Sequence, residues 1–213
     1  RMQLKLHSEK SMVTGYYGPV LDPTLKHIIK EGCVVYDIGA HIGYYSLWFA
    51  RRAGPTGAVV AFEPDPRTFE QLKTNININK VGNVKIVNAA VSDKSGSVSL
   101  RQGPITFDSY VIDGSVKADD ITVPSVSLDD FIMRDGNVEP DVLKVDVEGH
   151  EVEVLTGAET VLARHRPIVH CELHGKIRAR SVYRLLRRFG YTVRYVDESV
   201  LRDLPFEQYD FDF

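Results

Sequence analysis

Short apolar runs alternate with amphipathic segments along most of the chain, which predicts alternating strands and helices. Strands are expected at Val34–Ile38, Ala58–Phe62, Val84–Val91, Asp141–Val147, Ile168–Leu173 and Tyr191–Val196, with a last one within Phe206–Phe213. Helices are expected after the first two strands, across the stripe Val154–Leu162, and across Val182–Phe189. The pattern predicts an α/β fold in which a mostly parallel, seven-stranded sheet carries helices on both faces.

The region between residues 92 and 140 has a looser pattern. Its two alternating segments, Ser97–Leu100 and Ile121–Val126, are separated by polar turn residues and predict a hairpin or an excursion at the sheet edge. The length of 213 residues suits one domain with an embellishment. We therefore expect an N-terminal arm or lid at residues 1–30 and a single domain at residues 31–213.

Charge and cysteine content narrow the class of protein. The chain has 26 basic and 29 acidic residues, so it lacks the excess positive charge of a nucleic-acid binder. No apolar stretch is long enough to predict a membrane span. Cys33 and Cys171 lie far apart in apolar surroundings, which predicts buried thiols and a reducing, cytoplasmic location. The start Arg1-Met2 indicates a piece of a longer, multidomain chain.

The loop after the first predicted strand carries the clearest chemistry. Asp37 lies near the end of that strand, and Gly39 and Gly43 lead into the next helix. Glycine lets the backbone approach a ligand closely, and the first amides of the helix then face that ligand. A dinucleotide fold would have G-x-G-x-x-G, whereas this loop has G-x-x-x-G with an acidic residue placed to meet an amino group. The spacing therefore argues against NAD.

A second acidic residue follows the next strand. Glu63 comes directly after Ala58–Phe62, where a carboxylate can accept hydrogen bonds from both hydroxyls of a ribose. An adenosine that carries a charged amino-acid tail would satisfy Asp37 and Glu63 together. A nicotinamide-dependent oxidoreductase on the same sheet is the competing interpretation, because a fold alone does not define a function.

Charged residues also gather at the ends of two later strands. Alternation sends Lys144, Asp146 and Glu148 to one side of their strand, and Glu172 and His174 alternate in the same way on the next. Charges that leave a buried strand need partners or water, which indicates a paired network or a wet catalytic cleft. The alternative is a salt-bridged strand end that orders the following helix.

Several of these segments resemble the FkbM family of S-adenosylmethionine-dependent methyltransferases. The motifs are Asp37-Ile38-Gly39-Ala40, Gly43, Glu63-Pro64, Asn88-Ala89-Ala90-Val91-Ser92 and Lys144-Val145-Asp146-Val147-Glu148-Gly149, within a match from about Val34 to Gly175. The resemblance implies a class I methyltransferase sheet with an antiparallel last strand. It also implies S-adenosylmethionine as cofactor and methyl transfer to an oxygen of a sugar, polysaccharide or polyketide-like product. His41 departs from the family loop, which usually has Asn at that position.

The resemblance assigns roles by position. Asp37 and Gly39 would contact the methionine end of the cofactor, Glu63 the ribose, and Asn88-Ala89 the adenine. The full set of cofactor-binding candidates is Asp37, Gly39, Ala40, His41, Gly43, Glu63, Pro64, Asn88, Ala89 and Asp146.

Methyl transfer to a hydroxyl also needs a base or a metal ion that lowers the pKa of the hydroxyl. His174 is the preferred base, with Asp146 or Glu148 as alternatives; Lys144 and Glu172 complete the catalytic candidates. Asp146, Glu172 and His174 are candidate ligands for Mg²⁺ or Mn²⁺. The leading prediction is an O-methyltransferase that acts on a hydroxyl of a sugar or glycan. A module that binds the cofactor without turnover is a further alternative.

Overall fold

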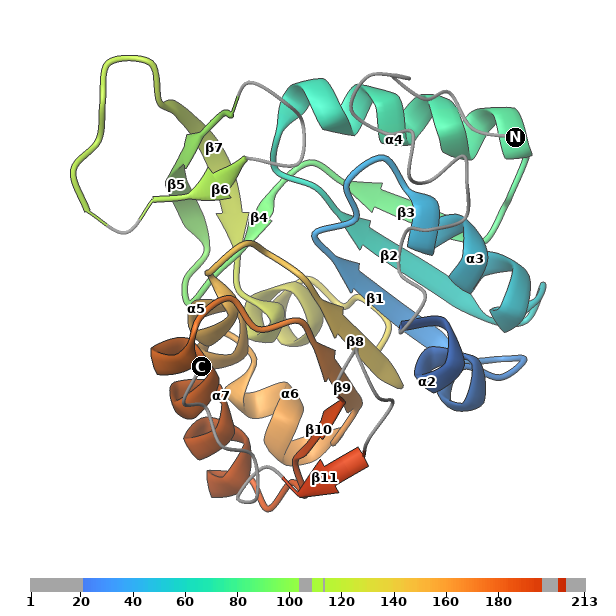
Figure 1. Cartoon of the computed structure of the whole chain (residues 1–213). Helices are drawn as coiled ribbons and strands as arrows, with labels where there is room; N and C mark the ends of the chain where they lie inside the picture. Colours follow the sequence, from blue (N-terminus) through green and yellow to red (C-terminus); the bar gives the residue numbers. More distant parts are fainter. Residues whose placement is uncertain (1–20, 104–108, 113, 197–202, 206–213) are drawn as a thin grey trace.

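Five parallel strands form the centre of the fold (Figure 1). The structure, a computed structural model, describes residues 21–103, 109–112, 114–196 and 203–205. The strands lie in the order β3 (Val84–Val87), β2 (Ala58–Phe62), β1 (Val34–Ile38), β8 (Val142–Val145) and β9 (Ile168–Cys171). All four pairings are parallel, so every strand ends at the same edge of the sheet. Because the strand order reverses beside β1, a ligand site is expected at that edge.

One face of this sheet is covered by three helices from the second half of the chain. They are α5 (Glu151–Thr156), α6 (Glu159–Arg164) and α7 (Lys176–Arg188). Tyr36, Phe62 and Leu143 point to this face and pack in one apolar cluster with Leu155 of α5 and Leu186 of α7. Burial of these large side chains stabilises the fold by about 25 cal/mol for each Å² of apolar surface removed from water.

The opposite face is covered by helices from the first half of the chain, as alternation along the strands requires. These helices are α2 (Leu21–Ile28), α3 (Tyr44–Ala53) and α4 (Pro66–Asn79). Val35 and Val59 pack against α2 and α3, whereas Ala61 packs against α4. Leu25 of α2 is fully buried, so this helix takes part in the packing of the domain although it falls within the stretch expected as an arm. Residues 1–20 of that arm lie outside the described residues.

The chain between β3 and β8 forms a second, mixed sheet beside the first (Figure 1). Its strands lie in the order β4 (Ala90–Val91), β7 (Ile121–Val126), β5 (Gly96–Arg101) and β6 (Tyr110–Val111). The expected pairing of the two alternating segments is confirmed, because β5 and β7 are antiparallel neighbours. The prediction of one strand across Val84–Val91 is wrong: β3 and β4 belong to different sheets. A π-helical turn at Asp130–Arg134 then leads toward β8.

The prediction of a single seven-stranded sheet is therefore also wrong, although the mostly parallel α/β architecture is confirmed. The C-terminal strands β10 (Arg194–Val196) and β11 (Asp203–Pro205) pair antiparallel with each other in a separate two-stranded sheet. The last strand expected within Phe206–Phe213 lies outside the described residues.

The helix expected across Val154–Leu162 is broken into α5 and α6. Gly157 lies at the break, and a Cβ atom there would come within 2.0 Å of the carbonyl oxygen of Ser92. The apolar stripe is nevertheless intact, since Val154, Leu155 and Val161 are all fully buried. The backbone at Ser92, just after β4, comes close to Gly157, and the helix is interrupted at this point although its apolar pattern continues.

None of the helices in the described part of the chain is long and apolar enough to cross a membrane. Cys33 and Cys171 are both free thiols and partly buried.

Candidate active site

A cavity of about 690 Å³, measured with its open mouth, lies between the carboxyl ends of β1, β2 and β8 and the mixed sheet. The lining residues are Ile38, Gly39, His41, Phe62, Glu63, Pro64, Ala89, Ala90, Val91, Leu100, Ser109, Tyr110, Val111, Asp146, Val147, Glu148 and His150. The cavity thus collects most of the predicted cofactor residues and two of the predicted catalytic carboxylates.

The glycine loop holds the β1 end of the cavity close to β8. Gly39 has φ +77°, and a Cβ atom at this position would lie 1.7 Å from the carbonyl oxygen of Asp146. The amides of Gly39 and Ala40 both donate to the carbonyl of Phe62, at 3.1 and 2.9 Å. Gly43, also left-handed at φ +87°, precedes α3 and faces Leu72. Only glycine fits this backbone at position 39.

Glu63 is the buried carboxylate of the cavity wall. It is 7% exposed, and its two oxygens accept hydrogen bonds from the backbone amides of Asp65 and His41, each at 2.9 Å. Burial raises the pKa of Glu63 to about 8, although the two amides pull it downward. His41 serves this contact through its backbone, at φ +49°. The structure places Glu63 on the wall of the cavity.

Asp37 lies beneath the cavity rather than on its wall. Its side chain is fully buried: Lys144 Nζ lies 3.1 Å from Oδ1, and the Ser46 hydroxyl donates to Oδ2 at 2.5 Å. Asp37 and Lys144 are register partners on the adjacent strands β1 and β8. Lys144 Nζ also donates to the carbonyl of Gly39 at 2.9 Å and lies 3.4 Å from Asp146 Oδ2. This buried pair therefore braces the glycine loop from below.

The loop after β3 supplies an apolar wall. Ala89 is buried and lines the cavity, next to Pro64 from the loop after β2. The Asn88 side chain donates to the carbonyls of Glu63 at 2.8 Å and of Pro64 at 3.3 Å. Asn88 thus links the loops after β2 and β3. Its side-chain amide bonds to the backbone of the cavity wall, and Asn88 itself is not among the lining residues.

Three chemically active side chains meet at the β8 and β9 end. One ligand-type atom each of Asp146, Glu148 and His174 lies within 4.8 Å of the others. His174 Nε2 is 3.3 Å from Glu148 Oε2, and His174 Nδ1 is 2.7 Å from Glu151 Oε1. Glu151 is fully buried and also accepts a hydrogen bond from the amide of Gly149 at 2.8 Å. The chain reaches this arrangement through a left-handed Glu148 at φ +51°.

The charge around His174 sets its protonation. The hydrogen bond to Glu151 raises the pKa of His174 to about 9, with further support from Glu148 and Asp146 and with burial opposing. The imidazole therefore holds a proton near neutral pH. A base must arrive deprotonated, so within this cluster the carboxylates suit that role better than His174.

Glu172 is not part of this cluster. Its side chain is exposed, and the residues whose atoms come together are Asp146, Glu148 and His174. Strand β9 ends at Cys171, two residues before the predicted end at Leu173, so Glu172 and His174 lie after the strand and its alternation does not reach them. The set of metal-ligand candidates changes accordingly, with Glu148 in the place of Glu172.

Two groups of cavity residues escaped sequence reasoning. His150 is buried, lines the cavity, and its Nε2 lies 3.0 Å from the Ser92 hydroxyl. A continuation of the alternation through Lys144, Asp146 and Glu148 points to this position. The other group, Ser109, Tyr110 and nearby residues of the mixed sheet, has no motif that would have revealed it.

The carboxylate of Asp65 links this wall, formed by the mixed sheet, to the segment that follows β2 of the parallel sheet. Asp65 caps the N-terminus of α4, and accepts a hydrogen bond from the amide of Arg67 at 2.9 Å. It also accepts hydrogen bonds at 2.8 Å from Gln102 and from the hydroxyl of Ser109. Because the Asp65 side chain is fully buried, these bonds form in a protected setting.

The sheet order and the position of the cavity define a methyltransferase-like α/β domain. Methyltransferase FkbM from Methylobacillus flagellatus KT, a solved structure, superposes with a TM-score of 0.55 at 18% identity, over 74% of this chain and 37% of that one. A precorrin-6y C5,15-methyltransferase from Geobacter metallireducens superposes with a TM-score of 0.53 at 14% identity, over 85% of this chain and 79% of that one. These likenesses support the fold.

The chain belongs to the FkbM methyltransferase family, because the family model of the methyltransferase FkbM domain matches residues 37–193. Hexuronic acid methyltransferase AglP of Haloferax volcanii is 31% identical over 160 residues, which cover 74% of this chain and 62% of that protein. The 31-O-demethyl-FK506 methyltransferase FkbM of Streptomyces tacrolimicus is 30% identical, over 78% of this chain and 75% of that protein. The chain thus spans less than two thirds of the Haloferax protein. The family expected from sequence is confirmed, which favours methyl transfer over the oxidoreductase alternative.

Proposed function

We propose that this domain transfers a methyl group from S-adenosylmethionine to a hydroxyl of a sugar or glycan. The observation that carries the proposal is the arrangement of one cavity. A buried carboxylate, Glu63, lines one end, and the cluster of Asp146, Glu148 and His174 gathers at the other. The names of two relatives, one acting on hexuronic acid and one at a 31-O position, support an oxygen acceptor.

The glycine loop, Glu63 and the apolar wall suit the parts of this cofactor. Glu63 keeps lone pairs for two ribose hydroxyls while its amide partners hold the carboxylate in place. Gly39 leaves the backbone open to close approach, and Ala89 and Val147 offer apolar contact for a flat base. Asp146, on the cavity wall, is placed to accept from an amino group, the role first expected for Asp37. The cofactor supplies an electrophilic methyl group on sulfur.

The residues at the other end position the acceptor and receive its proton. A hydroxyl becomes strongly acidic as its oxygen forms the new bond to carbon, so a carboxylate is a sufficient base. Glu148 lines the cavity, and the protonated imidazole of His174 at 3.3 Å balances its charge. We assign the base to Glu148, with Asp146 as the alternative. His174 and Glu151 hold Glu148 in position, much as a third group orients a catalytic pair.

A divalent cation is a second candidate component of this end. Asp146, Glu148 and His174 would hold it, and two carboxylates with one imidazole suit Mg²⁺ or Mn²⁺ when water completes the shell. The proton on His174 would have to leave first, so the ion would compete with it. Full activity after dialysis against excess chelator would eliminate the metal from the proposal.

Two measurements test the proposed reaction. Calorimetric titration with S-adenosylmethionine and with NAD should show binding of the first alone. Incubation with a panel of neutral and acidic sugars should then yield S-adenosylhomocysteine with at least one acceptor. If the protein bound NAD but not S-adenosylmethionine, the oxidoreductase interpretation would be favoured instead. Binding of S-adenosylmethionine without product from any acceptor would support the non-catalytic module.

A further inference from the structure

Helix α7 carries a basic stripe that begins beside the reaction end of the cavity. The helix follows Gly175, directly after His174, and its 13 residues include six basic side chains and no acidic one. The other 200 residues hold 20 basic against 29 acidic residues. Helix α7 is therefore strongly basic, whereas the rest of the chain has an excess of acidic residues.

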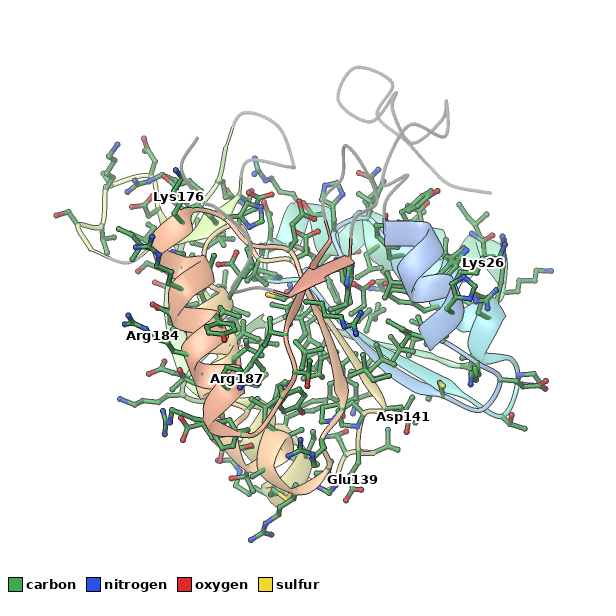
Figure 2. All side chains as sticks on the ribbon, turned by 60° about the horizontal axis from the view of Figure 1, so that its bottom comes forward. Lys26, Glu139, Asp141, Lys176, Arg184 and Arg187 are labelled. Carbon is green, nitrogen blue, oxygen red and sulfur yellow. The ribbon has the colours of Figure 1, made fainter. Side chains whose placement is uncertain are left out.

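The stripe lies on the side of α7 that faces away from the core. At 3.6 residues per turn, Lys176, Arg180, Arg184 and Arg187 fall within an arc of about 80°. The buried residues of the same helix, Ala179, Val182, Leu185 and Leu186, occupy the opposite side. All four basic residues of the stripe are exposed. Figure 2 shows Lys176 at the start of α7, with Arg184 and Arg187 farther along it.

Three of the six basic side chains of α7 have no carboxylate partner in the described part of the chain. Arg178 and Arg188, off the stripe, pair with Glu153 at 3.2 Å and Glu159 at 3.6 Å. Among the described residues, no carboxylate forms an ion pair with Arg180, Arg184 or Arg187. Like charges in a row repel one another, and an anionic partner relieves that repulsion.

We propose that α7 binds the anionic part of the acceptor, a glycan chain that carries carboxylate, sulfate or phosphate groups. This inference rests on the proposed function, and it specifies the substrate class of the same site. The stripe runs for about 17 Å from Lys176 to Arg187, the length of a short oligosaccharide. The unit that reacts enters the cavity, and the charged units that follow it lie along α7. The acidic cluster of the cavity therefore meets a hydroxyl and not the anionic groups.

Other polyanions fit these observations less well. A membrane-binding helix places several large apolar side chains beside its basic ones, whereas α7, described over its whole length, exposes a single large hydrophobic residue, Ile177. A nucleic-acid surface needs a broad basic face, whereas here the excess of basic residues belongs to one helix, and the rest of the chain has more acidic than basic residues. A hydrophilic anionic chain matches a stripe that is one helix wide.

The test compares two variants with the same loss of charge. One is Arg180→Gln/Arg184→Gln/Arg187→Gln on α7, and the control is Lys73→Gln/Lys94→Gln/Lys117→Gln at exposed positions elsewhere. The probe is a short oligogalacturonate, with a neutral oligogalactose of equal length beside it and S-adenosylhomocysteine present throughout. The full chain is used, so that the acidic residues after Val196 are present in every measurement.

We expect the α7 variant to bind oligogalacturonate about tenfold more weakly than wild type, and the control variant to match wild type. Wild-type affinity should fall as sodium chloride rises from about 50 to about 200 mM, and the α7 variant should show a smaller salt dependence. Equal affinity of wild type and the α7 variant, or equal losses in both variants, would overturn the proposal. Anionic vesicles and DNA are tested in the same assay, and a loss of affinity confined to either of them would overturn the proposal as well.

Cofactor affinity separates this inference from the function on which it rests. Calorimetry with S-adenosylmethionine should give the same affinity for wild type and both variants, because the stripe lies outside the cavity. If wild type fails to bind S-adenosylmethionine, the proposed function fails. If it binds S-adenosylmethionine and the α7 variant retains its affinity for oligogalacturonate, only the inference about α7 fails.

Discussion

At the β1 and β2 end of the cavity, the wall is formed by the glycine loop and by one buried carboxylate that backbone amides hold. At the β8 and β9 end, the functional groups are side chains from separate segments. Glu63 is held by two amides that lie close to it in the fold. Glu148 is held by His174, which in turn depends on Glu151. The first end is shaped by the backbone of two loops that follow neighbouring strands, and the second by a network of side chains from more distant segments.

Gly39 joins the two ends, and its replacement by Ala should have the largest effect. The added methyl group would occupy space 1.7 Å from the carbonyl of Asp146, and the left-handed backbone would add strain. We expect a loss of about 3 kcal/mol in the free energy of unfolding and the loss of cofactor binding. Urea unfolding and calorimetry measure the two effects.

The matched control for this change is Gly136→Ala. Gly136 has a similar φ of +71°, but nothing lies within 4 Å of the position that the added methyl group would take. This control should cost only the backbone strain, about 1–2 kcal/mol, and leave cofactor affinity intact. Equal losses in both variants would show that the close approach of β1 and β8 is not what Gly39 protects.

The next largest effect is expected at the reaction end. Glu148→Gln removes the proposed base and leaves the shape of the side chain, so kcat should fall by roughly 10²–10⁴-fold. Cofactor affinity should stay near the wild-type value, because Glu63 and the glycine loop are untouched. Turnover under saturating cofactor, together with calorimetry, separates the two quantities.

Glu172→Gln is the control for that substitution. Alternation with His174 predicts a catalytic Glu172, yet its side chain is exposed and outside the cluster. We expect this variant to turn over near the wild-type rate. A large loss at Glu172 with little change in Glu148→Gln would reverse the assignment of the base.

The contrast between the two ends also explains what sequence can predict. The Gly39 loop and Glu63 can be found because each lies at the end of a strand whose apolar run is unmistakable, and local backbone geometry does the rest. The same reasoning places Asp37 at the cavity, but the register of β1 and β8 sets Lys144 beside it and draws it inward. Strand register depends on the whole sheet, so it cannot be predicted from the local pattern of apolar and polar residues.

The mixed sheet is a second example of structure that the sequence pattern does not predict. The run Val84–Val91 has the apolar pattern of one strand, and its division between β3 and β4 depends on β7, which begins thirty residues after β4. The role of Ser109 and Tyr110 in the cavity wall depends likewise on Asp65, 44 residues earlier than Ser109. Such contacts arise from packing between distant segments, so periodicity alone does not reveal them.

The smallest of the three effects is expected at the cofactor end, from Glu63→Gln. Both Glu63 oxygens accept hydrogen bonds from backbone amides. In the Gln variant, the side-chain NH₂ group, which is a donor, would face one of these backbone N–H donors. We expect the affinity for S-adenosylmethionine to fall about 10- to 100-fold, with a smaller change in kcat at saturation. Glu70→Gln, at an exposed site on α4, is the control and should bind normally.

The pH dependence of cofactor binding sharpens this last prediction. Because burial raises the pKa of Glu63 to about 8, the free protein holds this carboxyl largely protonated at pH 7, and hydroxyl donors need it ionised. Affinity for the cofactor should therefore rise with pH, by up to about tenfold per unit below pH 8, and level off above it.

The stability of the free protein changes with pH in the opposite sense. A folded pKa above the unfolded value contributes stability that is complete below about pH 4.5 and is lost as pH rises through about 8. Glu63→Gln should flatten both profiles in calorimetry and urea unfolding; an unchanged slope in that variant would assign the titration to another group.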